Sequence, residues 1–223
     1  MEPTARPRIK VCCISSAEEA WIAIRAGASA LGLVSAMPSG PGVIGDELIA
    51  EIAARVPPGV ATFLLTSSTD PARIVSQQRG AQVNTLQLVD AVEPDALREL
   101  RAELPGVALV QVIHVRGPES VDEARRVAPL VHAILLDSGN PAAAVKELGG
   151  TGRVHDWELS RRIREAVDVP VYLAGGLRSE NVAEAVGRVG PFGLDVCSGV
   201  RTDGRLDADK LARFVAAATL IPG

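Results

Sequence analysis

The chain has 223 residues, of which 47% are hydrophobic and only 3% aromatic, and it carries a formal net charge of −4. This length and aliphatic composition predict one folded domain over residues 1–223 and exclude a disordered chain. The charges form no basic stripe, which excludes nucleic acid as a partner, and no apolar run reaches the roughly 18 residues of a membrane span.

The cysteines and the N-terminus indicate the expected cellular compartment. Met1–Thr4 begins no apolar targeting segment, so we expect a cytoplasmic protein without a membrane partner. Cys12, Cys13 and Cys197 make an odd count in such a chain, and reduced thiols are expected. The adjacent pair has the wrong spacing for a zinc knuckle, and the histidines stand apart, so we predict no metal.

Short apolar runs alternate with amphipathic stretches along the whole chain. Eight runs predict strands, at Ile9–Cys12, Ala30–Val34, Ala61–Leu65, Thr85–Leu88, Ala108–Val115, Ala133–Asp137, Val169–Ala174 and Gly193–Cys197. Eight stretches predict helices, at Ala17–Ala26, Asp46–Arg55, Pro71–Arg79, Pro94–Glu103, Ser120–Val127, Trp157–Ala166, Ser179–Val186 and Asp207–Ala218. We expect Gly187 to end the seventh helix.

Eight strand–helix repeats predict a (β/α)₈ barrel, of the class known as a TIM barrel, with a doubly wound open sheet as the competing fold. Two runs favour the barrel, because Leu173–Leu177 and Leu194–Val200 each end a strand on glycine before a helix. Glycines at strand ends let backbone N–H groups approach a phosphate, and barrels hold such a site after strands seven and eight.

Two predicted loops are longer than usual and are expected at the barrel mouth. Ser35–Gly45 is rich in proline and glycine, and Ser138–Asp156 contains the run Gly149–Gly152. The N–H groups around Gly150 can bind an anion, although a plain flexible loop is the commoner meaning of such a run.

Polar side chains at strand ends supply candidate catalytic groups. Lys10 and Cys12 share one face of the first strand. An ammonium beside a thiol favours the thiolate, which can act as a base or nucleophile. The alternative is that Cys12 is an ordinary buried core residue. Asp137 ends an apolar strand, where a carboxyl group is costly unless it is paired or functional, and its alternative role is to cap a turn. Asp195 shares the inward parity of Cys197 but lies deeper, which favours a structural carboxylate that can also contact substrate.

Together these segments resemble the phosphoribosylanthranilate isomerase family nearly from end to end. The resemblance is carried by Lys10–Cys12, Leu135–Ser138, Gly149–Trp157, Ala174–Val182 and Asp195–Val200. It implies a (β/α)₈ barrel of tryptophan biosynthesis that converts an N-phosphoribosylated aminoaldose into a ketose by an Amadori rearrangement, without metal or cofactor. The implied partner is a small phosphorylated aminosugar, and the chain is expected as a monomer or a homodimer.

The resemblance also implies roles for particular residues. Asp137 is the general acid that protonates the furanose ring oxygen, and Cys12 is the general base that removes the C2′ proton. The backbone of Gly175, Gly176, Ser198 and Gly199, together with Gly150, holds the phosphate. Lys10, Gln87, Asp195 and Arg201 are the expected substrate-binding residues.

Some positions depart from the family pattern. The usual Ser-Pro-Arg, whose arginine pairs with the anthranilate carboxylate, is here Ser39-Gly-Pro-Gly42. The residue after the catalytic cysteine, ordinarily glycine, is Cys13, and the usual acidic residue after Ser-Gly-Val is Arg201. Gln-Leu-His-Gly after the fourth strand has become Gln87-Leu-Val-Asp90.

Three functional alternatives follow from these departures. The chain is a phosphoribosylanthranilate isomerase in which Arg116, Arg178 or Arg201 replaces the missing arginine, a paralogue acting on another phosphorylated aminosugar, or a non-catalytic phosphate-ligand binder. The presence of both Cys12 and Asp137 argues against the last.

Overall fold

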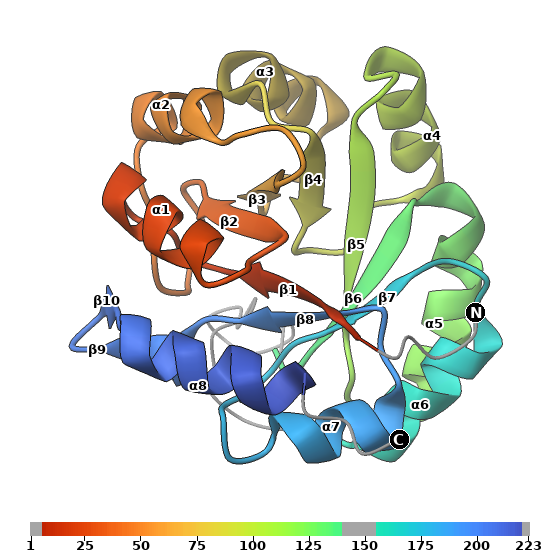
Figure 1. The fold of residues 1–223 in the computed structure, drawn as a ribbon. Helices are drawn as coiled ribbons and strands as arrows, with labels where there is room; N and C mark the ends of the chain where they lie inside the picture. The colour runs from red at the N-terminus through yellow and green to blue at the C-terminus, as the bar shows by residue number, and fades with distance from the viewer. Residues whose placement is uncertain (1–5, 140–154, 220–223) are drawn as a thin grey trace.

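A computed structural model describes residues 6–139 and 155–219 of the chain. Its central feature is a closed barrel of parallel strands in the order β1 to β8, surrounded by helices (Figure 1). The strands are β1 Arg8–Val11, β2 Ala30–Val34, β3 Ala61–Thr66, β4 Thr85–Leu88, β5 Ala108–His114, β6 Ala133–Asp137, β7 Val171–Leu173 and β8 Gly193–Val196. The closed order confirms the predicted barrel and excludes the open sheet.

One helix follows each strand of the barrel. The helices are α1 Ala17–Arg25, α2 Asp46–Arg55, α3 Pro71–Ala81, α4 Pro94–Glu103, α5 Glu119–Val127, α6 Trp157–Ala166, α7 Val182–Val189 and α8 Ala208–Thr219. Short 3₁₀ turns lie at Ala128–Leu130 and Ser198–Val200. Within residues 6–139 and 155–219 no helix is long and apolar enough to cross a membrane.

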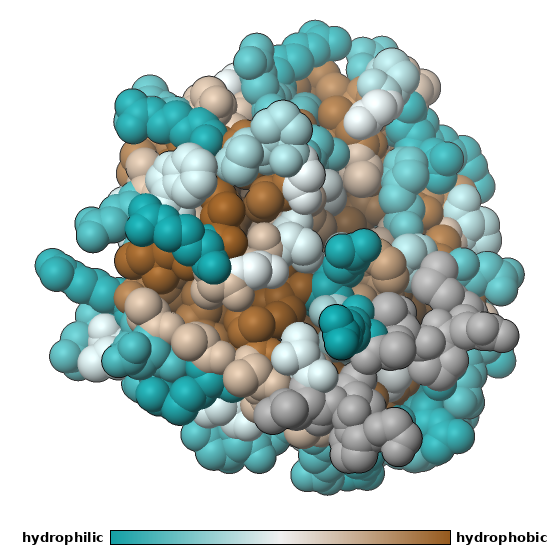
Figure 2. All heavy atoms as spheres, in the orientation of Figure 1, coloured by the Kyte–Doolittle hydropathy of each residue, from teal (hydrophilic) through white to brown (hydrophobic). Residues whose placement is uncertain are grey.

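The hydrophobic residues divide into two layers because each strand is buried on both faces. The larger layer fills the space between strands and helices and includes Leu31, Leu86 and Phe214. The smaller layer fills the barrel interior and includes Phe63, Val110 and Leu135. Figure 2 shows hydrophilic residues over the outer rim of helices and hydrophobic residues gathered towards the centre of the visible face.

The seventh helix differs from its predicted position. It begins at Val182 rather than Ser179 and continues through Gly187, which the sequence analysis placed at its end. The helix ends where Gly190 adopts a left-handed conformation, with φ of 63°. Gly190 supplies the C-terminal cap because glycine adopts this conformation without a Cβ clash, whereas Gly187 is tolerated within the helix.

A hairpin that was not predicted follows β8. Its strands are β9 Arg201–Thr202 and β10 Arg205–Leu206, which pair antiparallel. Asp203 and Gly204 form the turn with φ of 49° and 77°. Asp-Gly is a strong signal for a two-residue hairpin turn, and it was present in the sequence.

Candidate active site

A cavity opens at the carboxyl ends of the barrel strands. It holds about 660 Å³ of empty space, part of it open to solvent. The described residues that line it are Cys12, Cys13, Val34, Met37, Ser39, Gly40, Pro41, Leu65, Gln87, Val89, Asp137, Ala174, Gly175, Gly176, Leu177, Asp195, Cys197 and Ser198. This is the end of the barrel where active sites lie, and residues from seven of the eight strands and their loops meet there.

Cys12 and Asp137 face the same cavity from different strands. Cys12 follows the last residue of β1, and Asp137 is the last residue of β6. Both side chains are almost buried, with 6% and 8% of their surface exposed. Burial raises the pKa of Asp137, although the backbone N–H of Ser138, 2.7 Å from the carboxylate oxygen Oδ1, opposes the shift. A carboxyl group with a raised pKa is suited to donate a proton near neutral pH.

Lys10 and Asp195 form an ion pair across neighbouring strands below the cavity. The Lys10 ammonium lies 2.8 Å from the Asp195 carboxylate and 5.2 Å from the centroid of the Phe63 ring, and it is fully buried. Burial opposes its charge, but Asp195 holds the pKa of Lys10 above its usual value. A Cβ built on Gly32 would meet both Cys12 Sγ at 2.9 Å and Lys10 Nζ at 3.0 Å, so the ammonium and the thiol are neighbours, as the sequence predicts.

The two residues of this pair differ in their access to a ligand. Asp195 lines the cavity, whereas Lys10 is not among the described lining residues. Lys10 lies beside Asp195 and Cys12 rather than at the cavity surface, and its contact with substrate stays a prediction. The neutralised pair also explains how a fully buried ammonium is accommodated.

The expected phosphate-binding backbone lies at one side of the cavity. Gly175 and Gly176 line it with φ of 82° and 64°, values that favour glycine, and Ser198 lines it from the next loop. Gly199 lies behind them, where an added Cβ would collide with the carbonyl oxygen of Leu177. Gly150 lies outside the described residues.

Gln87 of β4 also reaches the cavity. Its side chain is buried, and its carbonyl oxygen Oε1 has no hydrogen-bond partner within the described parts of the chain. A buried amide oxygen without a partner is costly, so a ligand donor at this position would be favoured. Gln87 thus lines the cavity, and its contact with substrate stays a prediction.

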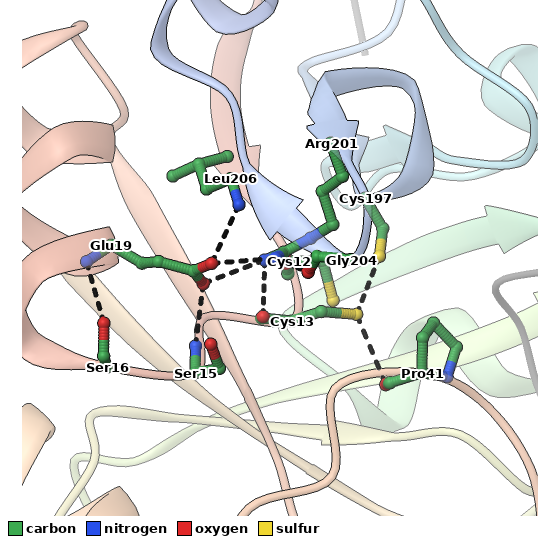
Figure 3. A network of polar contacts seen from close by, with 10 residues as sticks. All are labelled: Cys12, Cys13, Ser15, Ser16, Glu19, Pro41, Cys197, Arg201, Gly204 and Leu206. Carbon is green, nitrogen blue, oxygen red and sulfur yellow. Dashed lines mark hydrogen bonds and ion pairs between the residues drawn. The ribbon is translucent and has the colours of Figure 1, made fainter.

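Arg201 lies outside the cavity lining and is already paired. Figure 3 shows its guanidinium against Glu19 of α1, with Nη1 3.0 Å from Oε1 and Nη2 3.2 Å from Oε2. It also donates to the backbone carbonyls of Cys12 and Cys13, at 3.2 and 2.5 Å. Both terminal nitrogens of the guanidinium are therefore engaged within the chain, and the substrate-binding role of Arg201 stays a prediction.

Glu19 is the acceptor at the centre of this network. Besides Arg201 it accepts the backbone N–H groups of Ser15 and Leu206, at 3.0 and 2.8 Å. Burial opposes the charge of Glu19, but the hydrogen bonds from Arg201, Leu206 and Ser15 hold its pKa below the usual value. The sequence marks Arg201 as a departure and as a candidate substrate-binding residue, but it gives no sign of Glu19 as its partner, because Glu19 lies 182 residues earlier in the chain.

The other two candidate arginines are exposed and stand off the lining. Arg178 pairs at 3.7 Å with Glu180, and Arg116 follows β5, where its backbone N–H donates to the hydroxyl of Ser120. Among the described lining residues there is no arginine, lysine or histidine. Within the described chain, no cluster of three or more potential metal ligands has an arrangement able to hold an ion.

A contact between thiols was missed by the sequence analysis. Cys13 Sγ lies 2.8 Å from Cys197 Sγ and 3.5 Å from the carbonyl oxygen of Pro41 (Figure 3). Cys13 has a φ of 63°, a left-handed conformation usually taken by glycine. The replacement of an expected glycine by Cys13 was visible in the sequence, but its proximity to Cys197 depends on the pairing of β1 with β8.

Comparison with known proteins identifies the family of the chain. The chain matches the family described as N-(5′-phosphoribosyl)anthranilate (PRA) isomerase over residues 9–217. A protein of that name from Haloferax volcanii is 40% identical over 220 residues, covering 97% of this chain and 95% of the relative. One from Methanocella arvoryzae is 34% identical over 206 residues, covering 92% and 94%.

Solved structures of the same family share the fold. Phosphoribosyl anthranilate isomerase from Thermotoga maritima superposes with a TM-score of 0.82 at 28% identity, covering 95% of this chain and 98% of the other. A phosphoribosyl anthranilate isomerase solved with reduced 1-(o-carboxyphenylamino)-1-deoxyribulose 5-phosphate gives a TM-score of 0.80 at 26% identity, again covering 95% and 98%. The chain therefore belongs to the N-(5′-phosphoribosyl)anthranilate isomerase family.

Proposed function

We propose that this chain isomerises N-(5′-phosphoribosyl)anthranilate to 1-(2-carboxyphenylamino)-1-deoxyribulose 5-phosphate, with Asp137 as general acid and Cys12 as general base. The observation that carries the assignment is the placement of these two buried groups in one cavity, from strands β1 and β6 of the barrel. An aldose–ketose isomerisation needs one group that donates a proton and one that removes a proton at the same pH.

The reaction begins with the sugar closed as a furanose. Asp137 donates its proton to the ring oxygen, the C1′–O bond breaks, and the nitrogen lone pair forms a Schiff base at C1′. The Cys12 thiolate then removes the proton from C2′, which gives an enolamine. Tautomerisation of the enolamine places a proton on C1′ and leaves the ketone at C2′.

The phosphate of the substrate lies remote from these bonds. Gly175 and Gly176 offer backbone N–H groups from the loop after β7, and Ser198 and Gly199 offer theirs from the turn after β8. Binding energy from this dianion holds the sugar with C2′ near Cys12, which lowers the entropic part of the barrier. Asp195, held by Lys10, and Gln87 present polar atoms to the sugar between the two ends of the cavity.

The proposed roles are tested by separating binding from turnover. Calorimetry with a reduced, non-isomerising product analogue measures binding, and conversion of phosphoribosylanthranilate measures turnover. We expect Cys12→Ala and Asp137→Asn to keep analogue binding within a few-fold of the wild type while turnover falls by about 10²–10⁴-fold. Variants that keep both properties would overturn the acid–base assignment, and a wild type that does not bind the analogue would overturn the function.

A second substrate is favoured by one observation, the lack of a cation among the described lining residues. A related N-phosphoribosyl amine without a carboxylate would need no such cation. The two candidate substrates are distinguished by comparing kcat/KM for phosphoribosylanthranilate with kcat/KM for N-phosphoribosylaniline, which lacks the carboxylate. A strong preference for the aniline compound would assign the chain to the second substrate, because an absent charge-assisted pair costs about 1.5–3 kcal/mol.

A further inference from the structure

The two thiols that touch at the barrel mouth belong to neighbouring strands. Cys13 lies two residues beyond β1, and Cys197 lies one residue beyond β8. The strand ends are tied together by the backbone N–H of Cys12, which donates to the carbonyl of Val196 at 2.8 Å. The barrel framework therefore brings the two cysteines side by side, and their sulfurs lie 2.8 Å apart.

The electrostatic surroundings make the two thiols unequal. The hydrogen bond with Cys13 lowers the pKa of Cys197 although burial opposes the shift, and the charge of Arg201 lowers it further. Hydrogen bonds with Cys12 and with Cys197 raise the pKa of Cys13. A thiolate beside a protonated thiol is the pairing that cysteine oxidation uses, because the thiolate attacks the oxidant and the second thiol resolves the product.

The geometry allows a bond with little movement. A disulfide holds its sulfurs about 2.05 Å apart, so the two atoms need to approach by less than about 1 Å from their present separation. Both side chains line the cavity, and Cys197 is only half-buried, so a small oxidant that enters the cavity reaches them. Cys13 would exchange its weak contact with the Pro41 carbonyl for the bond to Cys197.

We propose that Cys13 and Cys197 form a reversible disulfide under hydroperoxide, and that this bond switches the active site off. In the first step the Cys197 thiolate attacks hydrogen peroxide, the O–O bond breaks, and the departing hydroxide takes a proton from solvent, so that sulfenic acid and water form. In the second step the Cys13 sulfur displaces the sulfenic oxygen, the S–S bond forms, and a second water leaves. Two thiols are oxidised and one peroxide is reduced.

The loss of activity follows from the neighbours of the bonded residues, and this part rests on the proposed function. Cys13 is joined through its peptide to Cys12, and Cys197 is joined to Ser198 of the phosphate-binding turn. Pulling both segments together displaces the base and the phosphate site at once. A displacement of about 1 Å costs up to about 10²-fold in rate, so kcat/KM should fall by about 10- to 100-fold.

The experiment titrates the purified chain with hydrogen peroxide and reads the bond by mass and by peptide mapping. We expect the intact mass to fall by two hydrogen atoms, and a tryptic digest to join the peptide after Lys10, which holds Cys12 and Cys13, to the peptide after Arg188, which holds Cys197. The Cys12→Ser variant should form the same bond, which assigns it to Cys13. Dithiothreitol should restore both the mass and the activity.

Cys13→Ser and Cys197→Ser serve as matched controls that keep the size of each side chain. The activity of each variant, measured against its own untreated sample, should resist peroxide doses that inactivate the wild type. Oxygen addition without loss of hydrogen, or a bridge that persists in Cys13→Ser, would overturn the proposal. The mass readout needs no substrate, so it tests disulfide formation independently of the proposed function. A chain that forms the bond but does not turn over phosphoribosylanthranilate would contradict the proposed function and support the disulfide.

Discussion

Asp137 is a buried carboxyl group whose protonation state decides whether it can act as an acid. Burial raises its pKa, so the protonated form persists to higher pH than for an exposed aspartate. A general acid works in its protonated form, and kcat/KM should therefore fall as the pH rises through this raised pKa. The Asp137→Asn variant should lose this alkaline limb together with about 10²–10⁴-fold in kcat.

The check is a pH profile of kcat/KM for the wild type and the variant, with a thermal melt of each. Because asparagine keeps the shape of the side chain, the melts should nearly coincide. A variant that turns over as fast as the wild type would remove Asp137 from the mechanism.

The buried pair of Lys10 and Asp195 makes a prediction about stability. Asp195→Asn leaves the Lys10 ammonium in the barrel interior without its anion, 2.8 Å away in the wild type. Removing one partner of a buried pair costs about 3–5 kcal/mol of unfolding free energy. Urea denaturation should show this loss, and a second change, Lys10→Met, should recover much of it in the double variant. Equal stability of Asp195→Asn and the wild type would contradict the pair's role.

The contact between Glu19 and Arg201 joins α1, the loop after β1 and the β9–β10 hairpin. Glu19→Gln removes the charge that holds Arg201 and should lower the free energy of unfolding by about 3 kcal/mol. Because the folded state depresses the pKa of Glu19, its contribution is present above the usual pKa of glutamate and is lost as the pH falls through the folded value. Glu18→Gln, an exposed neighbour on the same helix, is the control and should have little effect in urea denaturation. If Glu19→Gln and Glu18→Gln lowered the free energy of unfolding equally, the stabilising role of the Glu19–Arg201 contact would be contradicted.

The loop between β2 and α2 does not accommodate an arginine at position 42 in place of the missing family arginine without further change. Gly42 has a φ of 79°, and a Cβ there would overlap Cys13. We expect Gly42→Arg alone to destabilise the chain by about 1–3 kcal/mol without lowering KM for phosphoribosylanthranilate. The double variant Cys13→Gly/Gly42→Arg removes the contacts with the Cβ and Sγ atoms of Cys13, and it should lower KM relative to the single variant.

Gly40→Arg is the control for this loop. Gly40 also has a positive φ, of 113°, but a Cβ there would meet only the sulfur of Met37, at 3.9 Å. It should therefore show the cost of the backbone conformation without the clash. If Cys13→Gly makes no difference to Gly42→Arg, the two positions are not coupled.

His155 gives the chain as a whole an acid-sensitive stability. Its ring lies 2.7 Å from the hydroxyl of Ser160, and burial lowers its pKa to about 4. The unfolded chain binds a proton at His155 near pH 6.5, whereas the folded chain does not, so the free energy of unfolding should decrease as the pH falls from about 6.5 to about 4. The decrease amounts to about 2–3 kcal/mol.

Urea denaturation across this pH range tests the prediction. His155→Gln keeps a polar side chain without an ionising ring and should flatten the dependence on pH. A variant whose stability follows the wild type at every pH would show that another group is responsible.

The barrel could be predicted from the sequence because its strands are buried on both faces and read as short apolar runs. Asp137 and Cys12 were also recognisable, since each is a chemically reactive group at the end of such a run. The position of α7 was misjudged because Gly187 and Gly190 look alike in a sequence, and only the backbone conformation decides which of them ends the helix.

Contacts between residues far apart in the chain could not be predicted from the sequence. Nothing local to Arg201 shows that Glu19 is its partner, and an arginine near a binding loop looks available for substrate. The approach of Cys13 to Cys197 likewise depends on the closure of the barrel between β1 and β8. The Asp203–Gly204 turn is the exception, because its hairpin signal was local and was overlooked.

The most direct measurement follows the loss of anthranilate-type fluorescence when the purified chain is added to freshly generated phosphoribosylanthranilate. We expect a decay faster than spontaneous hydrolysis, abolished in Cys12→Ala and in Asp137→Ala. The proposed isomerase function would be contradicted if the folded wild type gave no excess decay. The roles of Cys12 and Asp137 would be contradicted if both variants decayed as fast as the wild type.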